Sequence, residues 1–172
     1  YIATAIILEA LEDSQCKSML VMIQKEVAQK FAAEPKSKEF TALAILTQSI
    51  GTATLLFDVD PTSFDPQPKV ISSILRIEKQ QEFVKGVYQG IFETKNEFES
   101  FKKYLRHSFQ SPRKTWMKNI SSEVDKVTLE KLMHEHQLLL TIRPHELSVL
   151  SHHLLFKDLR LNDARKRKQQ EP

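Results

Sequence analysis

The stretch PTSFDPQPK, from Pro61 to Lys69, constrains the fold of this chain more than any other feature, because three of its nine residues are prolines. Each proline fixes the backbone in an extended or turn conformation and lacks an amide donor, so the stretch is neither helix nor central strand. Apolar runs suited to β-strands flank it, ATLLFDV at 53–59 and VISSILRI at 70–77. The pattern therefore predicts a stiff loop between two strands, which holds Phe64 and Lys69 in fixed places.

The residues around Phe64 leave two interpretations of this side chain open. Phe64 can be a plug in the core, in which case the prolines only shape a connection. It can also offer its aromatic face to a flat ligand such as a nucleobase.

The first half of the chain alternates between helical and strand-like patterns. Helices are expected at 2–12, 24–33 and 39–50, the last with Gly51 as its C-cap. A short, uniformly apolar run at 18–23 is typical of a strand buried on both faces. Three strands are fewer than a helix-covered parallel sheet normally has. We therefore expect an α/β fold in which these residues form the second part of a larger sheet, closed at its edge by an antiparallel hairpin.

Beyond Glu78 helical periodicity replaces the strand-like pattern. A core-facing helix is indicated by aromatic and aliphatic side chains at helical spacing, Phe98, Phe101, Leu105 and Phe109. A short helix is expected to begin at Ser111-Pro112 and to carry Arg113, Lys114 and Lys118, with Trp116 in the core. A last helix is expected to open at Arg143, with four leucines facing inward: Leu147, Leu150, Leu154 and Leu155. We thus expect a sheet domain at 1–78, an all-α domain at 79–159 and a frayed basic tail at 160–172.

Positive charge is concentrated in the second half of the chain. The formal charge of +3 equals that of the tail 160–172, which has five basic and two acidic residues, so the first 159 residues are neutral. Within them, 95–120 holds seven basic and two acidic residues. Two basic regions favour a polyanion as partner, whereas solvated helix faces and a disordered end would explain the same charges without one.

Several classes of function lack their residues in this sequence. The three glycines, at 51, 86 and 90, form no nucleotide-binding loop. The histidines, His134, His136, His152 and His153 among them, have neither cysteine partners nor helical i, i+4 spacing, so surface positions are expected rather than a metal site. The apolar run at 2–8 is too short to span a membrane. A single cysteine, Cys16, favours a reducing compartment, and we expect a cytoplasmic location.

Five segments together resemble one family: YIAT at 1–4, QKEVA at 24–28, PTSFDPQPKVISS at 61–73, FQSPRKT at 109–115 and RPHELS at 143–148. The chain resembles the ribosomal RNA adenine dimethyltransferases of the small subunit, the KsgA type, over nearly its whole length. The proline loop with QKE upstream is shared with the erythromycin-resistance methyltransferases, whereas the RKT and RPxxLS elements favour the dimethyltransferases. By the register of this match, Tyr1 follows the family's N-L-P-Y motif, so we expect sequence upstream of it.

The resemblance implies a Rossmann-like methyltransferase domain followed by a small helical domain. It implies transfer of methyl groups from S-adenosylmethionine to two adjacent adenines of small-subunit ribosomal RNA, with the immature small subunit as partner, no metal, no membrane and a monomeric protein. The catalytic motif and the cofactor loop would lie upstream, so no cofactor-binding residue is assigned in this chain, which we expect to be inactive alone.

The resemblance also assigns site residues. It matches Phe64 to the aromatic that stacks on the flipped target base, so of the two interpretations given above it favours the aromatic face over the core plug. Pro66, Pro68 and Lys69 would keep that ring in place, close to phosphate. Arg113 and Lys114 match a basic turn that would contact the RNA backbone. Gln24, Lys25 and Glu26 match a family motif, but the sequence gives them no role.

Two other functions remain open from the sequence. One is a non-catalytic RNA-binding or ribosome-assembly module that uses the helical domain and basic segments. The other is an erythromycin-resistance enzyme that acts on large-subunit RNA.

Overall fold

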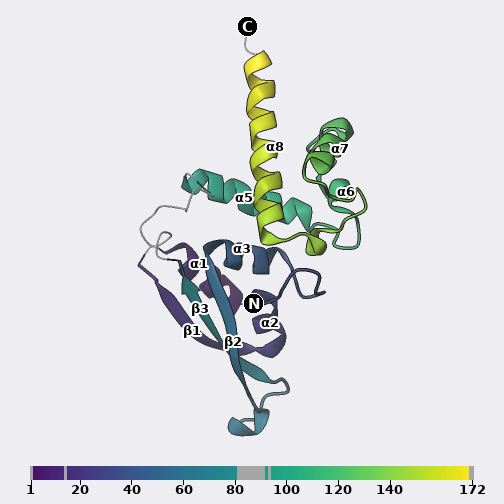
Figure 1. Cartoon of the computed structure of the whole chain (residues 1–172). Coiled ribbons are helices and arrows are strands. Elements are labelled where there is room, and N and C mark those ends of the chain that lie inside the picture. The colour runs from purple at the N-terminus through teal and green to yellow at the C-terminus, as the bar shows by residue number, and fades with distance from the viewer. Residues whose placement is uncertain (1, 14, 81–91, 93, 171–172) are drawn as a thin grey trace. The chain divides into compact units, whose positions relative to one another are not determined.

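The computed structural model describes residues 2–13, 15–80, 92 and 94–170, the last ten of them by their backbone alone. These residues fall into two compact units, Tyr1–Lys95 and Asn96–Pro172 (Figure 1). The boundary expected near 78–82 lies partly outside the described residues, and the sequence-based limits 1–78, 79–159 and 160–172 stay a prediction. Among the residues described, no helix is both long and apolar enough to cross a membrane.

A three-stranded sheet forms the centre of the first unit. Its strands are β1 (Ser18–Gln24), β2 (Gly51–Val59) and β3 (Ser72–Lys79), in the order β1-β3-β2. Strand β3 pairs antiparallel with both neighbours. The structure therefore confirms the α/β fold class and the antiparallel hairpin, in which the proline loop connects β2 to β3.

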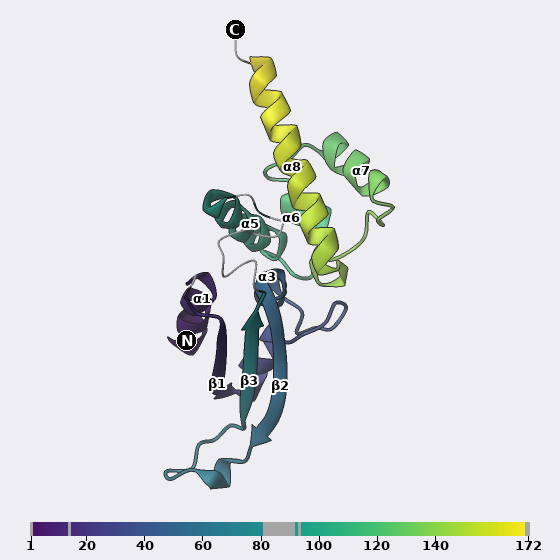
Figure 2. The same cartoon turned by 60° about the vertical axis from the view of Figure 1, so that its left-hand side comes forward.

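One face of this sheet is covered by helices, α1 (Ile2–Glu12), α2 (Lys25–Phe31) and α3 (Ala42–Ile50) (Figure 2). Strand β3 shows the alternation expected of a sheet with one covered face, since Ser73, Leu75 and Ile77 are buried while Arg76 and Glu78 are exposed. Helix α2 packs against all three strands. Its position matters for the site, because α2 begins at the residue that follows β1.

Gly51 ends α3 and begins β2 without a connecting loop. Its backbone is extended, with φ −168°, so the glycine is not required by a left-handed conformation. A Cβ at this position would overlap the carbonyl oxygen of Glu78 on β3. The sequence correctly identified the cap, but the close approach of the neighbouring strand explains why it is glycine.

The second unit is helical, with α5 (Lys95–Ser108), α6 (Trp116–Ile120), α7 (Lys126–Glu135) and α8 (Val149–Gln170), and a 3-10 turn at Pro144–Glu146. Its core is formed by buried aromatic and aliphatic side chains: Phe98, Phe101, Leu105, Trp116, Leu129, Leu132, Leu155 and Phe156. An ion pair of 2.6 Å between Arg160 and Glu97 joins α8 to α5. The backbone of α8 continues as helix to Gln170, so the basic tail is not frayed over that length.

Three expectations for this unit are wrong. The last helix begins at Val149 rather than Arg143, and Leu150 and Leu154 are exposed rather than inward. His152 and His153 occupy the inward positions instead, so they are buried and not on the surface. No helix starts at Ser111-Pro112, where the chain makes a turn before α6.

Candidate functional site

The proline loop projects beyond the end of the sheet in the first unit (Figures 1 and 2). It opens with a 3-10 turn, Pro61–Ser63, and Asp60 is the N-cap of this turn. The Asp60 carboxylate accepts two hydrogen bonds from Thr62, one from its backbone amide at 2.9 Å and one from its hydroxyl at 2.6 Å. These hydrogen bonds lower the pKa of Asp60 below its usual value. The loop therefore enters the turn in a conformation set by its own side chains.

Phe64 follows this turn, with its backbone amide donating to the carbonyl of Pro61 at 3.2 Å. Its side chain is partly buried, neither sealed in the core nor fully exposed. Pro66 and Lys69 are exposed and Pro68 is partly buried. In the part of the chain that the structure describes, Lys69 makes no ion pair. The loop thus gathers the four residues assigned to it from sequence, while the stacking role of Phe64 stays a prediction.

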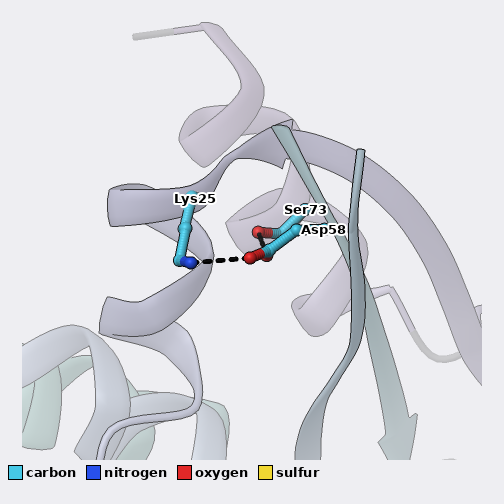
Figure 3. Close-up of polar contacts among 3 residues, drawn as sticks. All are labelled: Lys25, Asp58 and Ser73. Carbon is cyan, nitrogen blue, oxygen red and sulfur yellow. Dashed lines mark hydrogen bonds and ion pairs between the residues drawn. The ribbon is translucent and has the colours of Figure 1, made fainter. Parts of the chain in front are cut away.

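Three polar side chains from different elements meet at the root of this loop (Figure 3). Lys25, the first residue of α2, lies with its Nζ 2.6 Å from Oδ2 of Asp58 near the end of β2. Ser73, near the start of β3, donates its hydroxyl to Oδ1 of the same carboxylate at 2.6 Å. The hydrogen bonds from Lys25 and Ser73 lower the pKa of Asp58, so the carboxylate is ionised at neutral pH.

Lys25 also reaches the other end of the loop through its backbone. Its amide donates to the carbonyl of Ile71, the residue before β3, at 3.0 Å. One residue of α2 therefore bonds to both strands at the points where they enter and leave the loop. The sequence patterns left Lys25 without a role and did not single out Asp58 or Ser73; the only hint was a lysine directly after one strand and an aspartate near the end of another.

A second group of assigned residues lies in the turn between α5 and α6 of the helical unit. Lys114 closes this turn by donating its amide to the carbonyl of Ser111 at 2.9 Å. Arg113 and Lys114 are exposed, and neither forms an ion pair with any residue that the structure describes. Two adjacent cations without a counter-charge can bind an anion without first breaking a salt bridge.

Asn119 of α6 holds this turn from the inside. Its buried side-chain amide accepts from the amide of Ser111 at 2.9 Å and donates to the Ser111 carbonyl at 3.1 Å. The same amide nitrogen lies 3.3 Å from the carbonyl of Thr115. Asn119 could not be identified from the sequence, because hydrogen bonds from one side chain to backbone groups leave no repeating pattern along the chain.

A buried chain of hydrogen bonds in the helical unit begins at Trp116, the first residue of α6. Trp116 donates its indole N–H to the hydroxyl of Tyr104 at 3.1 Å, and this hydroxyl lies 2.9 Å from Nδ1 of His152. His152 Nε2 lies 2.9 Å from the carbonyl of Pro144. Because a carbonyl only accepts, Nε2 carries the proton and Nδ1 accepts from Tyr104. Burial lowers the pKa of His152 to about 4, so the ring is neutral.

No group of three His, Cys, Asp or Glu side chains among the described residues has the arrangement of a metal site. A nucleoside cofactor needs acceptors for its ribose hydroxyls, but the carboxylates at the loop end of the sheet are already engaged, Asp58 by Lys25 and Asp60 by Thr62. Asp58 and Asp60 therefore do not by themselves make a site for S-adenosylmethionine.

Comparison with known proteins decides the family. The model of the ribosomal RNA adenine dimethylase family matches residues 1–160. The chain belongs to this family. It is 43% identical over 170 residues to ribosomal RNA small subunit methyltransferase A of Campylobacter concisus, covering 99% of this chain and 60% of that protein. The corresponding Campylobacter fetus protein is 45% identical over 166 residues, covering 96% of this chain and 58% of the relative.

Solved structures share the fold of this family member. A dimethyladenosine transferase from Plasmodium falciparum superposes with a TM-score of 0.71 at 18% identity, over 93% of this chain and 63% of that one. The 23S rRNA methyltransferase ErmE gives a TM-score of 0.65 at 18% identity, over 92% and 61%. The chain spans about 60% of the length of the curated relatives that it matches.

Proposed function

We propose that this chain is the substrate-recognition portion of an S-adenosylmethionine-dependent methyltransferase that dimethylates two adjacent adenines in small-subunit ribosomal RNA. The family match over residues 1–160 carries this proposal, and relatives at 43% and 45% identity bear the name of small-subunit methyltransferases. The reaction would act on the immature small subunit during ribosome biogenesis. In the complete enzyme, S-adenosylmethionine supplies the methyl group.

Phe64 is the residue that we assign to the target base. An adenine must leave its stack before its exocyclic amine becomes accessible, and an aromatic face offsets part of the lost stacking, about 1–3 kcal/mol per base. The partial exposure of Phe64, in a loop stiffened by Pro66 and Pro68, supports this role. Exposed Lys69 would contact phosphate beside the flipped nucleotide.

Arg113 and Lys114 are assigned to the RNA backbone. Phosphate contacts fix the register of an RNA-binding protein without reading its sequence. The exposed turn that carries these two cations, held from inside by Asn119, supports a contact of this kind. The basic residues of the tail 160–172 add positive charge to the same unit.

We propose that this chain by itself does not transfer methyl groups. The cofactor loop and the N-L-P-Y motif of the family have no counterpart in its sequence. We further propose a monomeric, metal-independent enzyme of the cytoplasm, which associates with RNA and not with a membrane.

Two alternatives have specific support. The structural likeness to the 23S rRNA methyltransferase ErmE keeps large-subunit RNA open as substrate. The exposed basic turn is also compatible with a non-catalytic ribosome-assembly module.

Labelled methyl incorporation into unmodified small ribosomal subunits tests the proposal. This chain would be compared with a version extended upstream to the length of its relatives, each with labelled S-adenosylmethionine. Incorporation into the small subunit by the extended version only is the expected result. Incorporation into large-subunit RNA instead would favour the second enzyme class, and subunit binding without incorporation by either version would favour the assembly module.

A further inference from the structure

The loop that carries Phe64 is closed at its root by residues outside the loop. Residues 60–71 connect the end of β2 to the start of β3, and the Asp60 cap orders only the first turn. The remaining loop residues would change direction with any change at the two strand ends. The contacts that fix the loop ends of β2 and β3 therefore determine where Phe64 lies.

Lys25 bonds to both ends. Its ammonium lies 2.6 Å from the Asp58 carboxylate on β2, and its amide lies 3.0 Å from the carbonyl of Ile71 before β3. Ser73 ties the second carboxylate oxygen of Asp58 to β3 at 2.6 Å. Figure 3 shows the three side chains converging from the start of α2 and the two strands.

The strand pairing of the hairpin is irregular near the loop, where these side-chain contacts lie. The register between β2 and β3 shifts between Leu55 and Phe57, so a bulge lies two residues before Asp58. A bulge bends the strand and increases its twist, which changes the direction in which the loop leaves the sheet. Pairing resumes beyond the bulge, where Asp58 lies opposite Ser73, and the Lys25 contact joins this last part of the hairpin to α2.

We propose that Lys25, Asp58 and Ser73 are positioning residues that hold the proline loop in the orientation in which Phe64 receives the target base. This inference rests on the proposed methyltransferase function for its catalytic consequence, but the loop orientation can be measured without it. Both side chains of the ion pair are partly exposed, Lys25 at 39% and Asp58 at 46%. Exposed ion pairs contribute little to global stability, so the effect of breaking this one is expected at the loop and not in the unfolding transition.

The test compares Lys25→Met and Asp58→Asn with a matched control, Glu78→Gln, in the protein as its gene encodes it. Lys25→Met removes the ammonium group but keeps the backbone amide and an unbranched side chain of similar length. Glu78 is a carboxylate on the same hairpin, 3.5 Å from Arg76, on the uncovered face of the sheet and away from the loop. Hydrogen exchange of the amides at 62–71, the unfolding temperature, and kcat and KM for methyl transfer to small-subunit RNA are measured for each.

We expect Lys25→Met and Asp58→Asn to speed exchange of the loop amides about fivefold or more and to lower kcat about tenfold, with the unfolding temperature unchanged. Glu78→Gln should match the wild type in all three measurements. The double reversal Lys25→Asp with Asp58→Lys restores the ion pair in the opposite sense, and an aspartate is tolerated in a first helical turn. Recovery of both loop protection and kcat in this variant would separate positioning from a local loss of packing.

Unchanged loop exchange in both single variants would overturn the inference. So would faster exchange with wild-type kcat, because the loop orientation would then not matter for the reaction. If the wild type itself transfers no methyl group, the proposed function fails, while the exchange measurement still decides whether Lys25 and Asp58 hold the loop.

Discussion

The side-chain amide of Asn119 satisfies both backbone groups of Ser111, accepting from its N–H and donating to its C=O. Asn119 lies on α6 and Ser111 opens the turn that carries Arg113 and Lys114. Because the side-chain amide of Asn119 is buried and hydrogen-bonded through both its oxygen and its nitrogen, it fixes the start of this turn relative to the helix. The orientation of two exposed cations therefore depends on one buried side chain.

Asn119→Ala is expected to destabilise the helical unit and to weaken RNA binding together. The substitution leaves the backbone N–H of Ser111 without its partner, while the Ser111 carbonyl keeps the bond from the Lys114 amide, and an unsatisfied donor costs about 1–3 kcal/mol. Urea unfolding followed by the fluorescence of Trp116, the single tryptophan, measures the loss. Asn96→Ala, at an exposed position in α5, is the matched control. Equal urea midpoints for wild type and Asn119→Ala would contradict the structural role of this amide.

Phe64→Ala in the complete enzyme should lower kcat/KM for methylation about tenfold to hundredfold, since one stacked base is worth about 1–3 kcal/mol. Phe64→Tyr keeps the ring and should retain most activity. The control is Phe57→Ala, which removes an exposed phenyl ring from β2 of the same hairpin. Unchanged turnover in Phe64→Ala, with a native circular dichroism spectrum, would exclude the stacking role.

Reversal of Arg113 and Lys114 to glutamate should weaken RNA binding and reduce its dependence on salt. Each lost phosphate contact removes about 0.7 to 0.9 from the magnitude of the slope of log K against log salt. The matched control reverses Lys126 and Lys131, two exposed cations of α7 that already pair with Glu130 and Glu135. Titrations at several salt concentrations measure the slope. A slope that falls equally in both double variants would indicate a general charge effect rather than a contact at the turn.

The helical unit is expected to lose stability as the pH falls from about 6.5 to about 4. Burial lowers the pKa of His152 to about 4 and, with Lys157 nearby, that of His153 to about 4, so both rings are neutral in the folded unit. The unfolded chain binds protons near pH 6.5 and the folded unit does not, so acid favours unfolding through this window. A shift of this size corresponds to roughly 3 kcal/mol for one histidine, as an upper value.

Urea midpoints at pH 7 and pH 4.5, again from Trp116 fluorescence, measure this loss. His152→Gln should flatten the pH dependence, with some loss of stability at pH 7 because the contact with Tyr104 changes. Identical midpoints at the two pH values in the wild type would refute the assignment of a neutral, buried His152.

Local sequence patterns predicted most elements of the fold. The expected helix at 2–12 agrees with Ile2–Glu12, and the expected strand at 18–23 agrees with Ser18–Gln24. This strand is not buried on both faces as expected, because Leu20 and Met22 are exposed. Apolar periodicity and the prolines are properties of neighbouring residues, so they identify elements well. Element ends were less accurate, since the last helix starts six residues later than expected, after the 3-10 turn at Pro144–Glu146. Its inward face was also wrong, because His152 and His153 are buried where Leu150 and Leu154 were expected.

Local sequence patterns predicted a stiff, proline-containing loop between two strands, a helical region with basic residues after it, and the family that the motifs resemble. How these parts are held became visible in the folded chain. Lys25 meets Asp58 across 33 residues of sequence, and Asp58 meets Ser73 across 15. Such polar contacts join single residues of different elements and follow no repeat along the chain. They arise when the hydrophobic packing of α2 and the sheet brings the strand ends together, and so they are visible only in the folded protein.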